Sequence, residues 1–260
     1  ILENINFICI PGRIMAKARK TEKQLDYLYG VHPLIEMIKA KRRRLHTLYT
    51  TKPEPRAFSQ VKKLLPPRVQ MQYVERAVLT KMVGTSDHQG IVACVDPVSY
   101  RQKFFDPKKE RFILFLDQIQ DPRNLGAILR SAYCTGVQGV IVCEQKSASL
   151  SATASKSAAG LSEHLELFRV KNSAQAVRLL NDAGYTMYAA VFNGQDAATV
   201  AYKDPLCLVI GSEGHGVSRV IADHAQRVTI AQRTADISYN ASVAAGILLF
   251  LIGTSKKFVK

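Results

Sequence analysis

Residues 112–252 alternate between short apolar runs and longer segments with helical spacing, and this alternation is the strongest constraint on the fold. We expect strands at 112–116, 140–143, 165–170, 186–192, 206–210 and 227–230, and helices at 125–135, 174–183 and 240–252. The strand runs are continuously apolar, which is typical of strands buried on both faces. The sequence therefore predicts an α/β domain with a parallel sheet covered by helices on both sides.

A second, smaller α/β unit is expected at residues 24–98. Its predicted helices are 31–40 and 56–65, and its predicted strands are 45–50, 69–73 and 90–95. Residues 99–111 are rich in Lys and Arg and poor in apolar side chains, so we interpret them as a linker. We expect Phe104 and Phe105 to anchor it, and stacking on RNA is the alternative. The predicted organisation is thus a leader at 1–23, domains at 24–98 and 112–260, and a linker between them.

The first 23 residues are interpreted as a disordered leader with a basic end. Charge does not precede the apolar stretch, so a secretory signal is not predicted. One hypothesis is that Met15 is the natural start and that residues 1–14 are an extension. An organellar targeting segment is the alternative, favoured by the scarcity of acidic residues.

Charge and cysteine content narrow the class of partner and the compartment. The formal net charge is +15, which suits a polyanion such as nucleic acid, because basic side chains that neutralise phosphates release counterions. No apolar run reaches the roughly 18–20 residues of a membrane span, so we expect no membrane partner. Five cysteines without a C-x-x-C pair indicate reduced core residues of a cytoplasmic protein.

A glycine turn follows the apolar run at 206–210 and marks a ligand site. Its sequence is Gly211-Ser212-Glu213-Gly214-His215-Gly216. Glycines allow positive φ and close approach of a ligand to backbone N–H groups. The G-x-x-G-x-G spacing is neither a dinucleotide fingerprint nor a phosphate loop.

Two further segments accompany this turn. Residues 117–132 read DQIQDPRNLGAILRSA, and residues 237–248 read ISYNASVAAGIL. Together with the glycine turn, and in this order, they resemble the motifs of the SPOUT superfamily, and within it the SpoU/TrmH family of RNA 2′-O-ribose methyltransferases. The resemblance implies a trefoil-knotted α/β methyltransferase domain, S-adenosyl-L-methionine as the methyl donor, and a homodimer.

Three other segments resemble the branch of this family that methylates a guanosine of bacterial large-subunit rRNA. They are HQGIVA at 88–93, YGVHPLIE at 29–36 and SATASK at 151–156. The resemblance implies that the N-terminal domain binds RNA and is similar to the fold of kink-turn-binding ribosomal proteins. The basic runs at 41–44 and 62–63 fit this reading, although a solvated face is the simpler alternative.

The resemblance also assigns the catalytic residues. They would be Asn124, Arg130, Glu213, Ser238 and Asn240. Helix capping is the structural alternative for Asn124, Ser238 and Asn240. A guanidinium is a poor general base, so we expect Arg130 to orient the ribose hydroxyl and a phosphate. Glu213 would contact RNA or Arg130 of a second subunit, and a solvated loop carboxylate is the structural alternative.

Backbone groups would hold the methyl donor. By resemblance they lie at Gly211, Gly214, Gly216, Ile230 and Tyr239. Relatives usually carry Ile-Pro-Met followed by glycine where this chain has IAQRTAD at 230–236. We expect the loss of proline and glycine to weaken donor binding more than the fold.

The sequence thus predicts transfer of a methyl group to a guanosine 2′-hydroxyl in 23S-type rRNA. A tRNA 2′-O-methyltransferase of the same family and a non-catalytic RNA-binding or ribosome-assembly protein are the alternatives. No metal site is expected, because the histidines show no ligand spacing. Cys134 and Cys207 lie in apolar surroundings and are expected to pack in the core.

Overall fold

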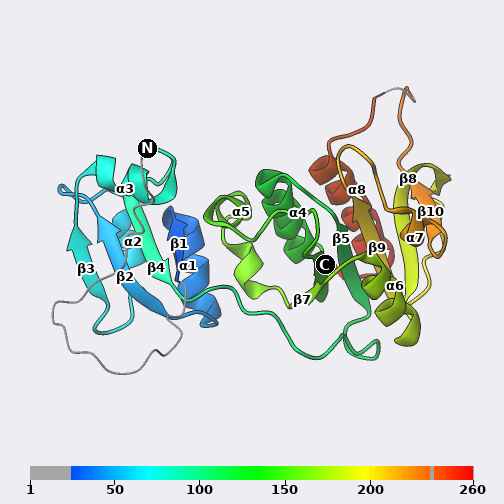
Figure 1. Cartoon of the computed structure of the whole chain (residues 1–260), viewed down its shortest axis with the longest axis horizontal. Coiled ribbons are helices and arrows are strands. Elements are labelled where there is room, and N and C mark those ends of the chain that lie inside the picture. Colours follow the sequence, from blue (N-terminus) through cyan, green and yellow to red (C-terminus); the bar gives the residue numbers. More distant parts are fainter. Residues whose placement is uncertain (1–24, 235–236, 260) are drawn as a thin grey trace, which may run out of the picture.

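The computed structural model describes residues 25–234 and 237–259. The predicted leader and the proposed start at Met15 lie outside this range. The described residues form one sheet within residues 26–95 and a second within residues 112–229, and Figure 1 shows them side by side with helix α5 between them. No helix in this part of the chain is long and apolar enough to cross a membrane.

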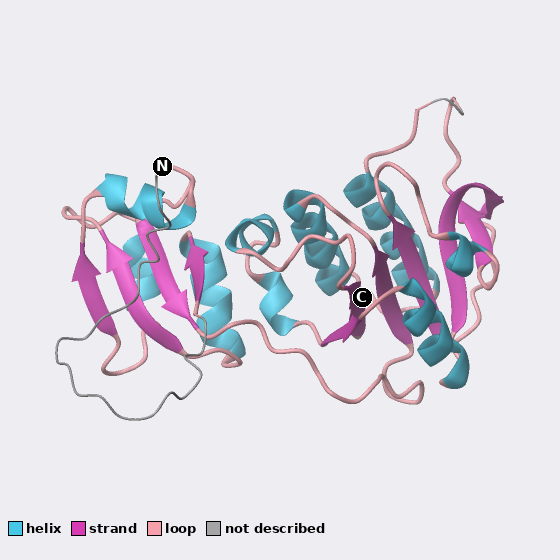
Figure 2. Ribbon diagram, in the orientation of Figure 1, coloured by secondary structure: helices cyan, strands magenta, loops and turns pink. Residues whose placement is uncertain are grey.

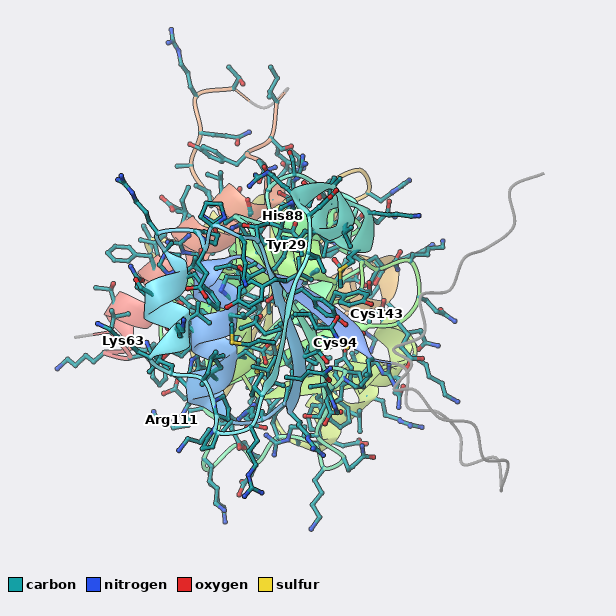
Figure 3. All side chains as sticks on the ribbon, turned by 90° about the vertical axis from the view of Figure 1, so that its left-hand side faces the viewer. Tyr29, Lys63, His88, Cys94, Arg111 and Cys143 are labelled. Atoms are coloured by element: carbon teal, nitrogen blue, oxygen red, sulfur yellow. The ribbon has the colours of Figure 1, made fainter. Side chains whose placement is uncertain are left out.

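The N-terminal sheet has four strands in the order β1-β4-β2-β3. Its elements are β1 (Asp26–Tyr29), α1 (Val31–Ala40), β2 (Leu45–Thr50), α2 (Phe58–Lys62), β3 (Gln70–Tyr73), α3 (Arg76–Val83) and β4 (Ile91–Val95). The sequence did not predict β1 and α3, and the second helix is shorter than expected. Viewed from this domain, buried Cys94 lies centrally and exposed Lys63 lies at the edge (Figure 3).

The C-terminal sheet has six parallel strands in the order β10-β8-β9-β5-β6-β7. They are β5 (Phe112–Asp117), β6 (Gly139–Cys143), β7 (Leu167–Val170), β8 (Thr186–Asp196), β9 (Leu206–Gly211) and β10 (Gln226–Thr229). The predicted parallel α/β sheet is therefore confirmed, and each expected strand is present with ends shifted by a few residues.

Helices cover both faces of this sheet, which explains why its strands are apolar throughout (Figure 2). One core contains side chains of α4 (Pro122–Cys134), α5 (Ala152–Ser157) and α8 (Ala241–Ser255). The other contains side chains of α6 (Ser173–Asp182) and α7 (Arg219–Ala222). Gly126 permits close packing of α4 on α5, because a Cβ there would lie 2.2 Å from the carbonyl oxygen of Ala154.

Aromatic side chains anchor the linker. Phe105 is 3% exposed, and its ring lies against Gly139, where an added Cβ would come within 2.1 Å of it. Phe104 packs edge-on against Phe105 and Phe168. The predicted anchoring role of both phenylalanines is confirmed. Cys134, in contrast, is exposed, so the prediction that it packs in the core was wrong, whereas Cys207 is buried.

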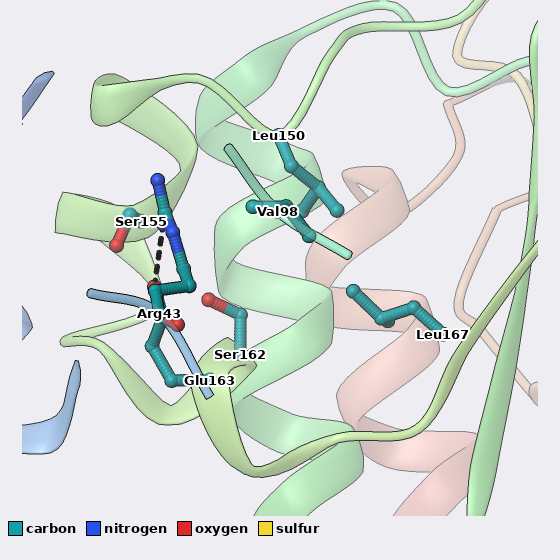
Figure 4. Close-up of a pocket in the computed structure, with 7 residues that line it drawn as sticks. All are labelled: Arg43, Val98, Leu150, Ser155, Ser162, Glu163 and Leu167. Carbon is teal, nitrogen blue, oxygen red and sulfur yellow. Dashed lines mark hydrogen bonds and ion pairs between the residues drawn. The ribbon is translucent and has the colours of Figure 1, made fainter. Parts of the chain in front are cut away.

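A buried ion pair joins the two domains (Figure 4). Arg43 Nη1 donates to Glu163 Oε1 at 2.9 Å, and the two side chains are 3% and 6% exposed. Arg43 also donates to the carbonyl oxygen of Asp96 and pairs with Asp26. The pair borders a cavity of about 20 Å³, and it lies between the start of β2 and the 3-10 turn Leu161–His164.

A second junction brings together two of the segments singled out in the sequence. Lys156 Nζ, from SATASK, donates to Gln89 Oε1, from HQGIVA, at 2.7 Å. The same oxygen accepts the N–H of Val31 at the start of α1. Gly160, with φ +80, also faces the N-terminal domain, and a Cβ there would lie 2.7 Å from Pro33 Cα. These contacts fix one domain against the other.

Candidate functional site

Three of the five predicted catalytic side chains meet at the carboxyl end of the parallel sheet. β5 and β9 are neighbours, and Asp117 pairs in register with Gly211 at their ends. The loop after β5 leads into α4, and the loop after β9 is the glycine turn. In open α/β sheets, ligands bind at this edge, so the fold alone places a site here.

The start of α4 differs from the prediction. The helix begins at Pro122, not at Leu125, and its N-cap is Asp121, whose carboxylate accepts the Arg123 N–H at 2.8 Å. Proline suits the first helical position because its missing N–H would lack a helical partner anyway. The capping interpretation of Asn124 was therefore wrong. Asn124 lies inside the first turn, is 9% exposed, and directs its amide at the site.

A chain of hydrogen bonds connects Glu213, Asn124 and Asn240. Asn124 Nδ2 donates to Glu213 Oε1 at 2.8 Å, and Asn240 Nδ2 donates to Asn124 Oδ1 at 3.1 Å. Asn240 Oδ1 accepts the N–H of Ser242 at 2.9 Å, so the predicted capping role of Asn240 is confirmed. Because an ionised Glu213 can only accept, it fixes the direction of every donor in the chain.

The glycine turn is a closed loop. Ser212 and Gly216 exchange backbone hydrogen bonds of 2.9 Å in both directions. Gly216 has φ +66, and a Cβ on Gly211 would lie 2.1 Å from the carbonyl carbon of Gly216. The N–H of Gly216 is therefore used inside the turn, contrary to the expectation that it is free for a ligand. Gly214 has open space around it, so the backbone there is accessible.

Asp117 stabilises the segment after the glycine turn by hydrogen bonds, and the sequence did not predict this role. Its carboxylate is 1% exposed and accepts the Ser173 hydroxyl at 2.6 Å and the Ser218 N–H at 2.7 Å. It thereby joins the turn after β9 to the start of α6. The available signal was an acidic residue at the end of a fully apolar strand, which predicts a buried carboxylate with dedicated donors.

The structure does not bring every predicted residue to this cluster. Arg130 is exposed on α4, six residues after Asn124, and thus on a different face of the helix. Ser238 and Tyr239 are exposed in the loop before α8, and Ser238 does not cap that helix, because Asn240 does. Ile230 is half-buried against the core just after β10.

The side chain of Gln232 bridges the loop after β10. Gln232 Nε2 donates to the carbonyl oxygens of Thr234 at 2.6 Å and Ile237 at 3.2 Å. Ile237 is 78% exposed. These two hydrogen bonds from Gln232 restrain the backbone of the loop, which contains neither proline nor glycine.

The electrostatics of the site centre on Glu213. Burial by itself raises the pKa of this carboxyl, but hydrogen bonds from Asn124 and from backbone N–H groups, including that of Gln120, outweigh it. The pKa therefore lies below its ordinary value of 4.5. The nearby N-terminus of α4 also favours a negative charge. Glu213 is thus ionised at neutral pH.

This lowered pKa predicts a pH dependence of stability. A carboxyl with a lower pKa in the folded state stabilises the fold above its unfolded pKa, and loses that contribution as the pH falls through the folded pKa. We expect the free energy of unfolding of the wild type to fall more steeply than that of Glu213→Gln as the pH drops from about 5 to about 3. Denaturant melts across this range measure it, and parallel curves would contradict the assigned role.

The double function of Asn240 can be separated by substitution. Asn240→Ala removes the cap and should lower the free energy of unfolding by about 1 kcal/mol. Asn240→Ser keeps a capping oxygen but cannot donate to Asn124 as the amide does, so its stability should stay near that of the wild type. We expect both variants to lose turnover equally. Full turnover in Asn240→Ser would show that capping is the dominant role.

The fold and the site define an α/β protein with a polar, hydrogen-bonded ligand site between the carboxyl ends of adjacent parallel strands. The SpoU rRNA Methylase family matches residues 111–250, and the RNA 2′-O ribose methyltransferase substrate binding family matches residues 27–101. The chain belongs to the SpoU rRNA methylase family, and the resemblance seen in the sequence is thereby confirmed.

Similar proteins agree with this assignment. The chain is 32% identical over 240 residues to YacO of Bacillus subtilis, named for the TrmH family of tRNA/rRNA methyltransferases, covering 88% of this chain and 95% of that one. It is 32% identical over 244 residues to the 23S rRNA (guanosine-2′-O-)-methyltransferase RlmB of Escherichia coli K12, covering 86% and 96%.

Solved structures share the fold. An RNA 2′-O ribose methyltransferase superposes with a TM-score of 0.79 at 18% identity, covering 91% of this chain and 90% of that one. An rRNA methyltransferase of Sinorhizobium meliloti, determined with S-adenosylmethionine bound, superposes with a TM-score of 0.76 at 23% identity, covering 90% and 88%.

Proposed function

We propose that this protein transfers a methyl group from S-adenosyl-L-methionine to the ribose 2′-hydroxyl of a guanosine in large-subunit, 23S-type rRNA. The observation that carries the proposal is the hydrogen-bond chain from Asn240 through Asn124 to Glu213. It lies at the sheet edge of a SpoU family domain. The 32% identity to RlmB supports the rRNA guanosine.

The chain offers a site that fits the methyl donor. The backbone of Gly214 is accessible, and the closed loop between Ser212 and Gly216 gives a rigid wall at the end of β9. The methyl donor would be held by backbone groups of Gly211, Gly214, Gly216, Ile230 and Tyr239. Gly216 would contribute by shaping the turn, because its N–H is used inside the turn. When bound, the donor supplies a methyl group on a positively charged sulfur.

The residues of the chain would position the ribose. The hydrogen bond to Asn240 and the carboxylate of Glu213 hold the Asn124 amide in one orientation, so the site loses little freedom when RNA binds. Arg130 would orient the 2′-hydroxyl and a neighbouring phosphate as a permanently charged donor. Ser238 would shape the pocket near α8.

A homodimer would complete this site. Arg130 lies on the exposed side of α4, away from the cluster around Asn124, so it would reach the site of a second subunit. α8 is apolar around its circumference and leaves Val243 and Phe250 exposed by 49% and 58%. Such side chains favour burial against a second copy of the chain. The proposal also includes a trefoil knot in the methyltransferase domain, as the family resemblance implies.

Methylation of tRNA by the same chemistry is a second candidate, supported by the name of the relative YacO, which covers both tRNA and rRNA. The N-terminal domain matches a substrate-binding family and contributes to the rigid domain junction. The fixed orientation of the N-terminal domain favours a structured RNA as the substrate, whether it is rRNA or tRNA.

The test incubates the purified protein with unmodified rRNA and tRNA and labelled S-adenosyl-L-methionine, followed by alkaline hydrolysis. A methylated 2′-oxygen cannot attack the adjacent phosphodiester, so the proposal expects label in an alkali-resistant dinucleotide whose 5′ base is guanine. Label in mononucleotides would mean base methylation. Absence of label with a folded protein, together with absence of donor binding by calorimetry, would support the non-catalytic alternative and implicate residues 230–236.

A further inference from the structure

An open hollow of about 600 Å³ lies on the N-terminal domain, away from the methyl-transfer site. It is found where the parallel strands β2 and β3 end, at the register pair Thr50 and Tyr73. Its lining comes from the end of β3, the start of α3 and the loops that follow β2 and β3, and it consists of Thr51, Lys52, Tyr73, Val74, Glu75 and Arg76. Its volume is that of sites that bind small molecules or single nucleotides.

Tyr73 forms a fixed aromatic surface in this hollow. Its side chain is 42% exposed, and its hydroxyl donates to Glu54 Oε1 at 2.7 Å. Lys62 in turn pairs with Glu54 at 3.3 Å. Tyr73 is thus held in place by polar contacts at its tip, and its ring stays partly open. Exposed aromatic rings of this kind stack nucleobases independently of sequence.

Two cations, Lys52 and Arg76, lie beside the same ring. Lys52 Nζ lies over one face of the Tyr73 ring, 4.4 Å from its centroid, so a base reaches that face only when the flexible lysine side chain turns aside. Arg76, at the start of α3, donates one guanidinium N–H to the carbonyl oxygen of Ser86 at 3.2 Å and is exposed. Glu75 is the one acidic residue of the lining. Two cations beside an aromatic ring favour a phosphate-linked base over an acidic peptide, which offers no stacking surface.

The hollow and the proposed methyl-transfer site each lie where parallel strands end. In Figure 2 the arrowheads of β2 and β3 point in the same direction as those of β5 and β9. The domain junction, made by Arg43 with Glu163 and by Lys156 with Gln89, holds the two sites in a fixed relation. One RNA molecule can therefore contact both without a change in domain orientation.

The geometry points to the Tyr73 hollow as a binding subsite for an unpaired nucleotide of the RNA substrate. The base stacks on Tyr73 and displaces Lys52 from the ring face, and Lys52 and Arg76 contact the adjoining phosphates. This inference rests on the proposed function for the identity of the substrate, but it concerns binding and not the chemical step. It assigns to the N-terminal domain a specific aromatic contact in addition to its overall positive charge.

The test measures binding of a fluorescent 23S-type rRNA fragment by anisotropy across a range of salt concentrations. Tyr73→Ala should weaken binding by about tenfold or more, whereas Tyr73→Phe, which keeps the ring, should bind like the wild type. Lys52→Ala and Arg76→Gln should each reduce the salt slope by about 1. Lys108→Ala, an exposed linker lysine, is the matched control and should bind like the wild type.

Two outcomes would overturn the subsite. One is wild-type RNA affinity in Tyr73→Ala, which would leave an acidic protein segment as the occupant to test. The other is an equal loss in Tyr73→Ala and Tyr73→Phe, which would indicate the hydroxyl and its support of Glu54. Should Tyr73→Ala fail to fold, photo-crosslinking of wild-type protein to 4-thiouridine RNA must label the peptide containing Lys52 or Tyr73, and labelling elsewhere alone would refute the assignment.

These results separate the subsite from the proposed function. Loss of binding in Tyr73→Ala by a protein that transfers no methyl group supports the subsite and rejects the activity. Normal methyl transfer, with unchanged KM and RNA affinity in Tyr73→Ala, supports the activity and rejects the subsite.

Discussion

Arg130→Ala is expected to lower kcat for methyl transfer by about 10²- to 10³-fold, the usual effect of removing a preorganised charged donor from an active site. Arg130 is exposed and lies on a different face of α4 from the buried Asn124. Its removal should therefore leave the free energy of unfolding and the RNA affinity nearly unchanged. Single-turnover kinetics with saturating RNA measures the effect.

Arg178→Ala is the matched control, because Arg178 is also an exposed arginine within a helix, on α6 at the other face of the sheet. It should retain wild-type kcat. Mixing Arg130→Ala subunits with subunits defective at Asn124 tests whether Arg130 acts across a dimer. Partial recovery of activity is expected, since one site in each mixed dimer would be intact. Undiminished turnover in Arg130→Ala alone would refute its assigned role.

Glu163→Ala is expected to lower the free energy of unfolding by about 3 kcal/mol, because it leaves Arg43 buried without its closest carboxylate. The side chain of Arg43 is 3% exposed, and its remaining carboxylate partner, Asp26, is 41% exposed. Loss of Glu163 should also loosen the contact between the domains. Denaturant unfolding measures the stability, and limited proteolysis of the linker measures the loosening.

The control is Glu166→Ala, three residues further along the same segment. Glu166 pairs with Arg42 across the same junction, but the two side chains are 41% and 39% exposed. Exposed pairs contribute about 0–1 kcal/mol, so this variant should be close to the wild type. Equal destabilisation by both substitutions would mean that burial does not set the strength of the junction.

Local patterns in the sequence were sufficient for most of the C-terminal fold. The apolar runs before the glycine turn and at residues 112–116 gave the central strands, because a strand buried on both faces must be apolar throughout. The N-terminal domain was harder. Strand β1 and helix α3 were missed, since β1 is short and α3 carries exposed Ala77 and Val78, which blur its periodicity.

The candidate site was predictable as a set of residues but not as an arrangement. The motifs named Asn124, Glu213 and Asn240, yet their hydrogen bonds join residues 89 and 116 positions apart. Helix capping was the structural alternative for Asn124, and it was wrong because Asp121 caps the start of α4. No role was assigned to Asp117 from the sequence, because a buried acid is explained only by donors from distant segments.

The sequence by itself determined the alternation of elements, the parallel sheet, the family and the residues at its motifs, because these depend on local periodicity and short patterns. Only the tertiary structure decided which donors meet which acceptors, that Arg130 lies apart from the cluster around Asn124, and that two separate motifs meet as Gln89 and Lys156 between the domains. The reason is physical: hydrogen bonds and ion pairs depend on distances of about 3 Å, and chain folding alone brings remote residues that close.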